Sequence, residues 1–211
     1  YLLDESSTIG GTMTQLDKTF PTNDCAMCIL APKLVTAGRH PNIELVMNAE
    51  IRSVDGEEGH FKVELVRKPR RVNEEKCTGC GVCAQKCPVE AIDEFNQGLS
   101  DRGAIYVKYP QAVPLVCVID RDKCIGCGTC QEVCKAGAIE YDEEEKEIVL
   151  DVGSIVLAPG FEEFDPSLKS EYGYGRYPNV ISSIEFERVL SASGPYGGMV
   201  LRPSDGEVPR R

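Results

Sequence analysis

The sequence predicts an α+β chain in which a small cysteine-rich unit lies between two segments with strand and helix patterns. One observation is a four-cysteine pattern that occurs twice, beginning at Cys77 and again at Cys124. The other is that apolar residues outside the repeat alternate with polar ones in short runs bounded by glycine and proline, which is typical of β-strands. We therefore expect three segments, residues 1–72, 73–141 and 142–211.

Both copies of the repeat have the spacing C-x2-C-x2-C-x3-C, which bacterial ferredoxins use to hold [4Fe–4S] clusters. In two-cluster proteins of that kind, the fourth cysteine of each copy ligates the other cluster. The sequence therefore predicts two clusters with crosswise ligation. Cluster one is assigned to Cys77, Cys80, Cys83 and Cys134, and cluster two to Cys124, Cys127, Cys130 and Cys87.

The residues between these cysteines predict how each loop folds. Glycine allows turns with positive φ and relieves crowding, so three thiolates can come from one tight loop. We expect each fourth cysteine to begin a helix that leads away from the loop. The repeat continues beyond it, since residues 87–92 match residues 134–139, with Lys135 in place of Pro88. The loop glycines are Gly79, Gly81, Gly126 and Gly128.

Zinc, disulfides and chance account less well for the eight cysteines. Structural zinc sites use two C-x2-C pairs separated by about 12–20 residues, whereas here four cysteines fall within eleven positions. Disulfides would be strained between neighbouring cysteines, and the sequence shows no signal peptide. Chance does not produce two full copies of the pattern. Iron–sulfur ligation is therefore the favoured interpretation.

Composition limits the partners and the compartment. The formal net charge is −11, from 34 acidic and 23 basic residues, which argues against a nucleic-acid partner. No apolar stretch is long enough for a membrane span. Eleven cysteines without a signal peptide predict a reducing, cytoplasmic and anaerobic setting. The chain starts at Tyr1 rather than methionine, and we expect it to be an internal fragment of a longer polypeptide.

The N-terminal segment carries a weak signal for a dinucleotide cofactor. An apolar run ends at Asp4, and a glycine pair follows at Gly10 and Gly11. Dinucleotide-binding folds place an acidic residue after a strand, on the ribose hydroxyls, and glycines let the backbone approach the cofactor. No G-x-G-x-x-G motif is present, so such a fold would begin upstream of this chain.

Cys25 and Cys28 are predicted at the start of a helix capped by Asn23 and Asp24, with Pro32 kinking or ending its first part. A helix N-terminus stabilises thiolates. Three interpretations stay open: ligands of a further cluster completed elsewhere, a redox-active dithiol, or a buried structural pair.

Alternation predicts strands before the repeat at residues 43–47, 49–54 and 61–66, with a turn at 55–59. Residues 68–71 are expected to be a solvated basic connection.

Further elements are predicted between and after the two copies. A strand pair is expected at 104–108 and 113–119, with Cys117 buried in its second strand. Residues 148–158 are predicted to form two strands separated at Gly153. A Ser-x-x-Glu capping box predicts a helix from residue 182 to about 192.

Taken with its flanks, the chain resembles the iron–sulfur flavoprotein (A) component of heterodisulfide reductase. The resemblance covers nearly all of the chain and is carried by the glycine pair, the two cysteine motifs and four further stretches. These are residues 15–25, 29–33, 171–180 and 184–195.

The resemblance implies a two-cluster ferredoxin-like unit inserted into an incomplete FAD-binding, thioredoxin-reductase-like α/β domain. Asp4, Gly10, Gly11 and Gly160 would then contact FAD, although Pro159 stands where the related pattern has threonine. The implied role is electron transfer between FAD and ferredoxin in a methanogenic complex. Its partners would be the other components of that complex and a hydrogenase or dehydrogenase donor. An alternative is a non-catalytic electron carrier module.

Overall fold

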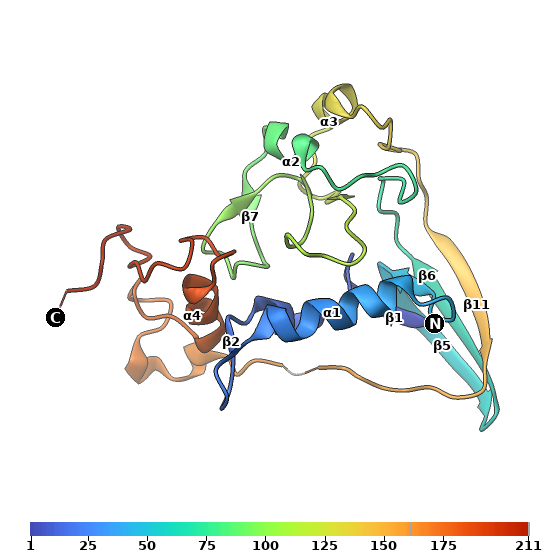
Figure 1. The fold of residues 1–211 in the computed structure, drawn as a ribbon, viewed down its shortest axis with the longest axis horizontal. Helices are drawn as coiled ribbons and strands as arrows, with labels where there is room; N and C mark the ends of the chain where they lie inside the picture. The colour runs from blue at the N-terminus through green and yellow to red at the C-terminus, as the bar shows by residue number, and fades with distance from the viewer. Residues whose placement is uncertain (161, 211) are drawn as a thin grey trace. The chain divides into compact units, whose positions relative to one another are not determined.

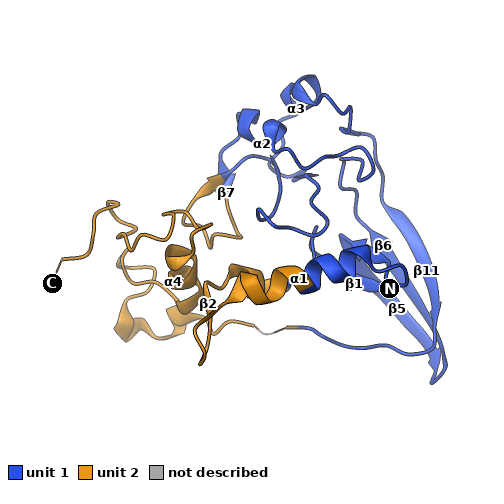
Figure 2. Cartoon of the chain, in the orientation of Figure 1, with its two compact units in different colours: residues 1–10, 33–91, 102–159 blue, residues 11–32, 92–101, 160–211 orange. Residues whose placement is uncertain are grey.

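A computed structural model of the chain describes residues 1–160 and 162–210. These residues divide into two compact units, each assembled from segments that are far apart in the sequence (Figure 2). Unit 1 comprises residues 1–10, 33–91 and 102–159, and unit 2 comprises 11–32, 92–101 and 160–211. Most of the cysteine-rich segment therefore belongs to unit 1. In the part of the chain described, no helix is long and apolar enough to cross a membrane.

Unit 1 is built on a three-stranded antiparallel sheet of order β11-β6-β5 (Figure 1). Strands β5 (Ala49–Glu57) and β6 (His60–Arg67) form a hairpin, and β11 (Lys146–Val152) pairs along the other edge of β6. The predicted strands are confirmed, and they extend into the predicted turn. Ala49, Val63, Leu65 and Leu150 of this sheet form a core together with Val46, which precedes β5.

Two short strands pair in parallel at the N-terminus. Strand β1 (Leu2–Asp4) lies beside β4 (Leu45–Met47), with Asp4 opposite Met47. Parallel neighbours need a crossover connection, and here the chain between them contains helix α1 (Ala26–Arg39). The predicted strand ending at Asp4 is confirmed.

Helix α1 differs from the prediction at its start, and it does not end at Pro32. Residues Asp24–Cys25 form strand β3 and pair with β2 (Lys18–Thr19), so the helix begins one residue after Cys25 and the predicted cap is wrong. The helix also continues beyond Pro32 to Arg39. Tertiary packing explains this, because Leu34 is buried and a Cβ at Gly38 would lie 2.6 Å from Val113.

The cysteine-rich segment contains short elements. Helices α2 (Val82–Lys86) and α3 (Thr129–Val133) lie within the two cysteine motifs. Strand β9 (Ile105–Tyr106) pairs with β10 (Val118–Ile119), which confirms the predicted strand pair in a shorter form. In addition, β7 (Ala91–Ile92) pairs with β8 (Asp101–Arg102).

The prediction that each fourth cysteine begins a helix is wrong. Cys87 and Cys134 instead close α2 and α3 as C-caps, with extended backbone (ψ 126° and 95°). For Cys87 the reason is Pro88, because a residue before proline is driven out of the helical region.

The second strand predicted within residues 148–158 is also wrong. After Val152 the backbone is irregular through residue 160, and the Val156 and Leu157 side chains are 89% and 82% exposed. A strand needs a neighbour for its backbone hydrogen bonds. None of the described strands pairs with this stretch.

Unit 2 contains the helix that the capping box predicts. Helix α4 (Ser183–Leu190) begins after Ser182, whose side chain accepts from the Glu185 N–H while Glu185 bonds back to Ser182 N–H. Buried Arg188 in this helix donates to the Gln15 carbonyl and to Asn96 Oδ1. The described part of the unit also contains three 3-10 helices: η1 (Gly11–Gln15), η2 (Pro166–Leu168) and η3 (Ser170–Tyr172).

Candidate iron–sulfur site

The two cysteine motifs fold in the same way. In each, a glycine in the left-handed region precedes a five-residue helix: Gly81 at φ 73° and Gly128 at φ 79°. The third cysteine of each motif then lies on that helix, and Cys83 and Cys130 are each 8% exposed. The predicted positive φ also holds for the first glycine of each motif. Equivalent sequence therefore produces equivalent geometry.

Four cysteines from both copies line one small cavity. Cys124, Cys127 and Cys130 come from the second copy, and Cys87 comes from the first. This is the set that the crosswise prediction assigns to cluster two. The rest of the lining is largely apolar, including Val89, Ala104, Ile105, Ile119 and Ile125. Four sulfur donors in a largely apolar setting fit a [4Fe–4S] cluster, and the ligation itself stays a prediction.

The cysteines assigned to cluster one pack against the hydrophobic core that also contains Cys130 of the second copy. Cys83 is buried, and Cys77 and Cys134 are partly buried against a core that includes Val72 and Ile139. Cys80 is exposed, as is its counterpart Cys127. All eight cysteines are free thiols, so the disulfide interpretation is wrong for them.

A site for a single metal ion requires several ligands around one point. Within residues 1–160 and 162–210, no three His, Cys, Asp or Glu side chains form such a group. A cubane spreads its four thiolates over four irons and does not need this convergence.

Cys117 is buried, as expected, but it lies one residue before β10 and not within a strand. It lies beside a proposed ligand of cluster one. Its side chain is 1% exposed, and its Sγ is 3.6 Å from Cys83 Sγ. A hydrogen bond from Cys117 lowers the pKa of Cys83 to about 6, and the same interaction raises the pKa of Cys117. Iron binds the thiolate form, so Cys117 favours the form of Cys83 that ligation requires.

In the second copy, two hydroxyl groups contact the cysteine sulfurs. The Tyr141 hydroxyl lies 2.9 Å from Cys130 Sγ, and Thr129 Oγ1 lies 3.4 Å from Cys127 Sγ. The Thr129 side chain and N–H lower the pKa of Cys127. Burial raises the pKa of Cys130, which the Tyr141 hydroxyl opposes. The prediction from sequence did not include Thr129, although comparing the two copies would have shown valine at its equivalent position.

The two ends of the cysteine-rich segment meet. Val72 and Ile139 form an antiparallel bridge, and the Asn73 N–H donates to the Ala138 carbonyl at 2.7 Å. Residues near the predicted boundaries 73 and 141 therefore close the segment on itself.

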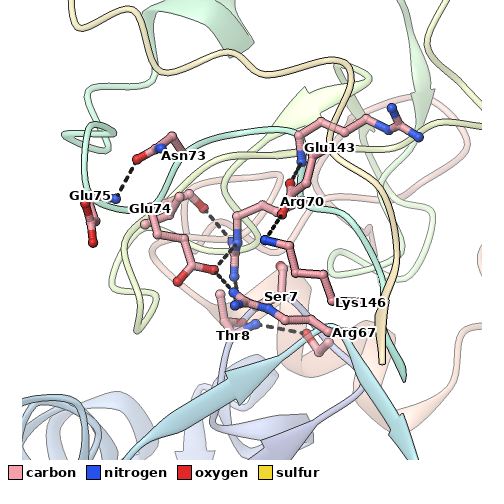
Figure 3. A network of polar contacts seen from close by, with 12 residues as sticks. Ser7, Thr8, Arg67, Arg70, Asn73, Glu74, Glu75, Glu143 and Lys146 are labelled. Atoms are coloured by element: carbon pink, nitrogen blue, oxygen red, sulfur yellow. Dashed lines mark hydrogen bonds and ion pairs between the residues drawn. The ribbon is translucent and has the colours of Figure 1, made fainter. Parts of the chain in front are cut away.

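A buried arginine joins this segment to the N-terminal loop (Figure 3). The Arg70 guanidinium donates to the Ser7 carbonyl at 2.6 Å and to the Val116 carbonyl at 3.3 Å, and it pairs with Glu74 at 3.0 Å. Its side chain is 1% exposed. The prediction that residues 68–71 form a solvated connection is therefore wrong for Arg70.

The predicted flavin contacts are divided between the two units. Asp4, whose Oδ1 accepts from the Ser6 N–H at 2.8 Å, and Gly10 at φ 116° belong to unit 1. Gly11 (φ 53°) and Gly160 (φ 74°) belong to unit 2. The positive φ values suit close backbone approach to a ligand. Flavin contact by these four residues stays a prediction.

Cys25 and Cys28 are joined by a disulfide at the start of α1. Cys28 is exposed and Cys25 is half-buried, so the interpretation as a buried pair is wrong. The remaining two interpretations, an additional cluster site and a redox-active dithiol, stay predictions.

Comparison with known proteins agrees with this geometry. A family described as "4Fe-4S binding domain" matches the chain twice, over residues 70–93 and 117–140. The matches cover both cysteine motifs. The chain is thus an iron–sulfur protein with two ferredoxin-type 4Fe–4S segments and a mixed helix and sheet fold.

Similarity over the whole chain identifies the family. All 211 residues match the iron–sulfur A subunit, copy 1, of CoB–CoM heterodisulfide reductase from Methanopyrus kandleri at 58% identity, covering 32% of that protein. The A subunit of H2:CoB–CoM heterodisulfide,ferredoxin reductase from Methanothermobacter marburgensis is 53% identical, again over all of this chain and 32% of the relative.

A third relative comes from Methanosarcina acetivorans. It is the A subunit of a ferredoxin/F420H2-dependent CoB–CoM heterodisulfide reductase, and it is 46% identical over 99% of the chain and 26% of its own length. The chain belongs to the family of heterodisulfide reductase A subunits and spans 26–32% of the length of these relatives. The resemblance inferred from the sequence is confirmed.

Proposed function

We propose that this chain is the electron-transfer part of a heterodisulfide-reductase-like iron–sulfur flavoprotein. Two [4Fe–4S] clusters, held crosswise, would carry single electrons between FAD and ferredoxin. The observation that carries the proposal is the cavity where Cys87 of the first copy meets Cys124, Cys127 and Cys130 of the second. The names of the relatives include ferredoxin and heterodisulfide. They support a role in a heterodisulfide-reductase-like complex that exchanges electrons with ferredoxin.

The chain's own residues provide ligands, exclude water and set charge. Buried Cys83 and Cys130 supply thiolates from helices fixed by their preceding glycines. Cys80 and Cys127 are exposed, so one ligand of each cluster would lie at the surface. The distance that an electron travels to a partner protein would be shortest there. Four thiolates per cluster favour the low potentials that ferredoxin chemistry requires.

The flavin and the partners belong to the same proposal. Asp4 is the last residue of a parallel strand, close to the position of the ribose-binding acid of a dinucleotide fold, and Gly10 would let the backbone approach FAD. The partners besides ferredoxin would be further subunits of the complex and a hydrogenase or dehydrogenase donor, in an anaerobic cytoplasm. Disulfide chemistry would reside elsewhere in the complex.

Paired cysteine variants of the full-length protein, purified without oxygen, test the ligand scheme by iron content. Cys80→Ala should remove about four irons, the content of one cluster. Adding Cys134→Ala should remove no more, because both cysteines serve cluster one. Adding Cys87→Ala instead should remove about eight, because Cys87 serves cluster two. The reverse result would show that each copy holds its own cluster and would refute crosswise ligation.

The alternative function is a carrier module without catalytic role, which the ferredoxin-type segments alone would permit. Flavin and iron quantitation on the same full-length protein separates the two. The proposed function requires bound FAD together with the iron. Iron without flavin would favour the carrier.

A further inference from the structure

The second copy places hydroxyl groups against two of its cysteine sulfurs. Tyr141 approaches Cys130 at 2.9 Å, and Thr129 approaches Cys127 at 3.4 Å. Tyr141 is half-buried and packs against the same core as the cysteines, so its hydroxyl is held in place. None of these contacts is part of the ferredoxin spacing.

The first copy is different at both corresponding positions. Its buried Cys83 contacts the Cys117 thiol at 3.6 Å, where the second copy uses a phenol. The residue equivalent to Thr129 is Val82, which has no polar group to offer. The pseudo-equivalent sites therefore have the same ligands and the same loop geometry but different hydrogen-bond donors.

The direction of these hydrogen bonds follows from ligation. In this structure the free Cys127 thiol donates to Thr129 Oγ1. A cysteine bound to iron is a thiolate and carries no proton, so in the cluster-bound protein its neighbour must be the donor. Tyrosine and threonine hydroxyls are good donors, whereas a thiol S–H is a weak one. A donor stabilises the reduced cluster more than the oxidised one, because reduction adds negative charge, and hydrogen bonds to sulfur thereby raise the potential.

We propose that Tyr141 and Thr129 make the two clusters inequivalent, so that cluster two has the higher reduction potential and accepts an electron first. This inference rests on the proposed function, since it concerns bound clusters. Each reduction transfers one electron from a low-potential one-electron donor to one cluster. No bond breaks, and the hydroxyl protons stay on oxygen. Tyr141 and Thr129 are tuning residues, and neither is a ligand.

Two features of cluster one act in the opposite direction. The Ala138 N–H donates to Cys134 Sγ at 3.4 Å, and Lys135 follows that cysteine. The Lys135 side chain is exposed, so solvent and salt screen its charge. Backbone N–H groups contact buried sulfurs in both copies, Ala84 at Cys83 and Gln131 at Cys130, whereas the 2.9 Å contact of a phenol with a cysteine sulfur is found in the second copy. The side-chain donors therefore decide the sign of the difference.

Redox titration of the full-length protein, followed by electron paramagnetic resonance, tests the inference. Tyr141→Phe should lower the equilibrium constant for reducing cluster two about tenfold, as expected for one hydrogen bond to a charged group, and Thr129→Val should lower it by less, because the contact of Thr129 with Cys127 is longer and exposed to water. For a one-electron couple, a tenfold change is about 59 mV. Val82→Thr, the reciprocal change, should raise the potential of cluster one. Tyr172→Phe, at an exposed phenol in unit 2, is the control and should change neither.

The signals are assigned by repeating the titration in Cys80→Ser and Cys127→Ser backgrounds, which disturb cluster one and cluster two respectively. Unchanged potentials in Tyr141→Phe and Thr129→Val at full iron content would overturn the inference, as would equal shifts in both clusters. If Tyr141→Phe loses iron, Thr129→Val decides alone, because it installs the residue that the first copy already tolerates. Wild-type protein lacking both clusters would refute the proposed function instead.

Discussion

At the scale of single residues, Arg70 is the buried charge that joins the N-terminal loop to the cysteine-rich segment. Arg70→Met would leave the carbonyl oxygens of Ser7 and Val116 buried without their donor. Leaving a buried acceptor unsatisfied costs about 1–3 kcal/mol, so we expect the free energy of local opening to fall by about 2–4 kcal/mol. Hydrogen exchange measured by mass spectrometry should show faster exchange at residues 1–10 and 113–119.

Arg67 is the matched control for Arg70, because it pairs with the same carboxylate, Glu74, from a side chain that is 26% exposed. Partly exposed ion pairs contribute about 0–1 kcal/mol, so Arg67→Met should change exchange only slightly. Equal effects of the two variants would mean that Glu74, and not the buried carbonyl oxygens, accounts for the stabilisation by Arg70.

At the scale of elements, the first loop glycines of the two motifs are equivalent in backbone but not in surroundings. Gly79 and Gly126 have φ of 65° and 70°. A Cβ at Gly79 would lie 2.7 Å from the Leu115 carbonyl oxygen, whereas nothing lies within 4 Å of a Cβ at Gly126. Both alanine variants should incur the left-handed strain of about 1–2 kcal/mol.

Gly79→Ala should in addition displace the loop of cluster one. We therefore expect it to lose iron from one cluster during anaerobic gel filtration, while Gly126→Ala retains close to the wild-type content. Equal retention by both variants would show that the contact with Leu115 relaxes without affecting the cysteines.

Elements with strong local signals could be predicted from the sequence, and short ones could not. Alternation predicted the β5–β6 hairpin, and the Ser182–Glu185 capping box predicted α4. Residues 154–158 have a strand pattern, but pattern alone does not reveal whether a neighbouring strand exists to pair with them. The helices that end at Cys87 and Cys134 were missed because five-residue helices depend on the loop around them.

At the scale of the whole chain, one part of the candidate site could be predicted from the sequence and another part could not. Motif spacing predicts which cysteines act together, since the reason is local loop geometry. The groups that contact their sulfurs come from elsewhere in the sequence: Cys117 lies 34 positions after Cys83, and Tyr141 lies 11 after Cys130. Arg70 likewise reaches Ser7, 63 positions away. Such contacts depend on tertiary packing, which no spacing rule describes.

The two cores of unit 1 predict how the chain responds to loss of iron. One core is rich in cysteine sulfur and is framed only by two-residue strands and five-residue helices. The second is the aliphatic core of the β11-β6-β5 sheet, which includes no cysteine among its buried residues. Metal sites of this kind couple ligation to folding, because a preformed set of thiolates is rarely stable without its metal.

Removing iron from the full-length protein with a chelator under reducing, anaerobic conditions should therefore unfold the cysteine-rich segment and spare the sheet. Hydrogen exchange should rise at residues 73–91 and 102–141, while β5, β6 and β11 keep their protection. Loss of protection in both regions together would mean that the sheet depends on the clusters for stability. Protection retained at the cysteine motifs would mean that their fold does not need iron, and that the clusters serve electron transfer alone.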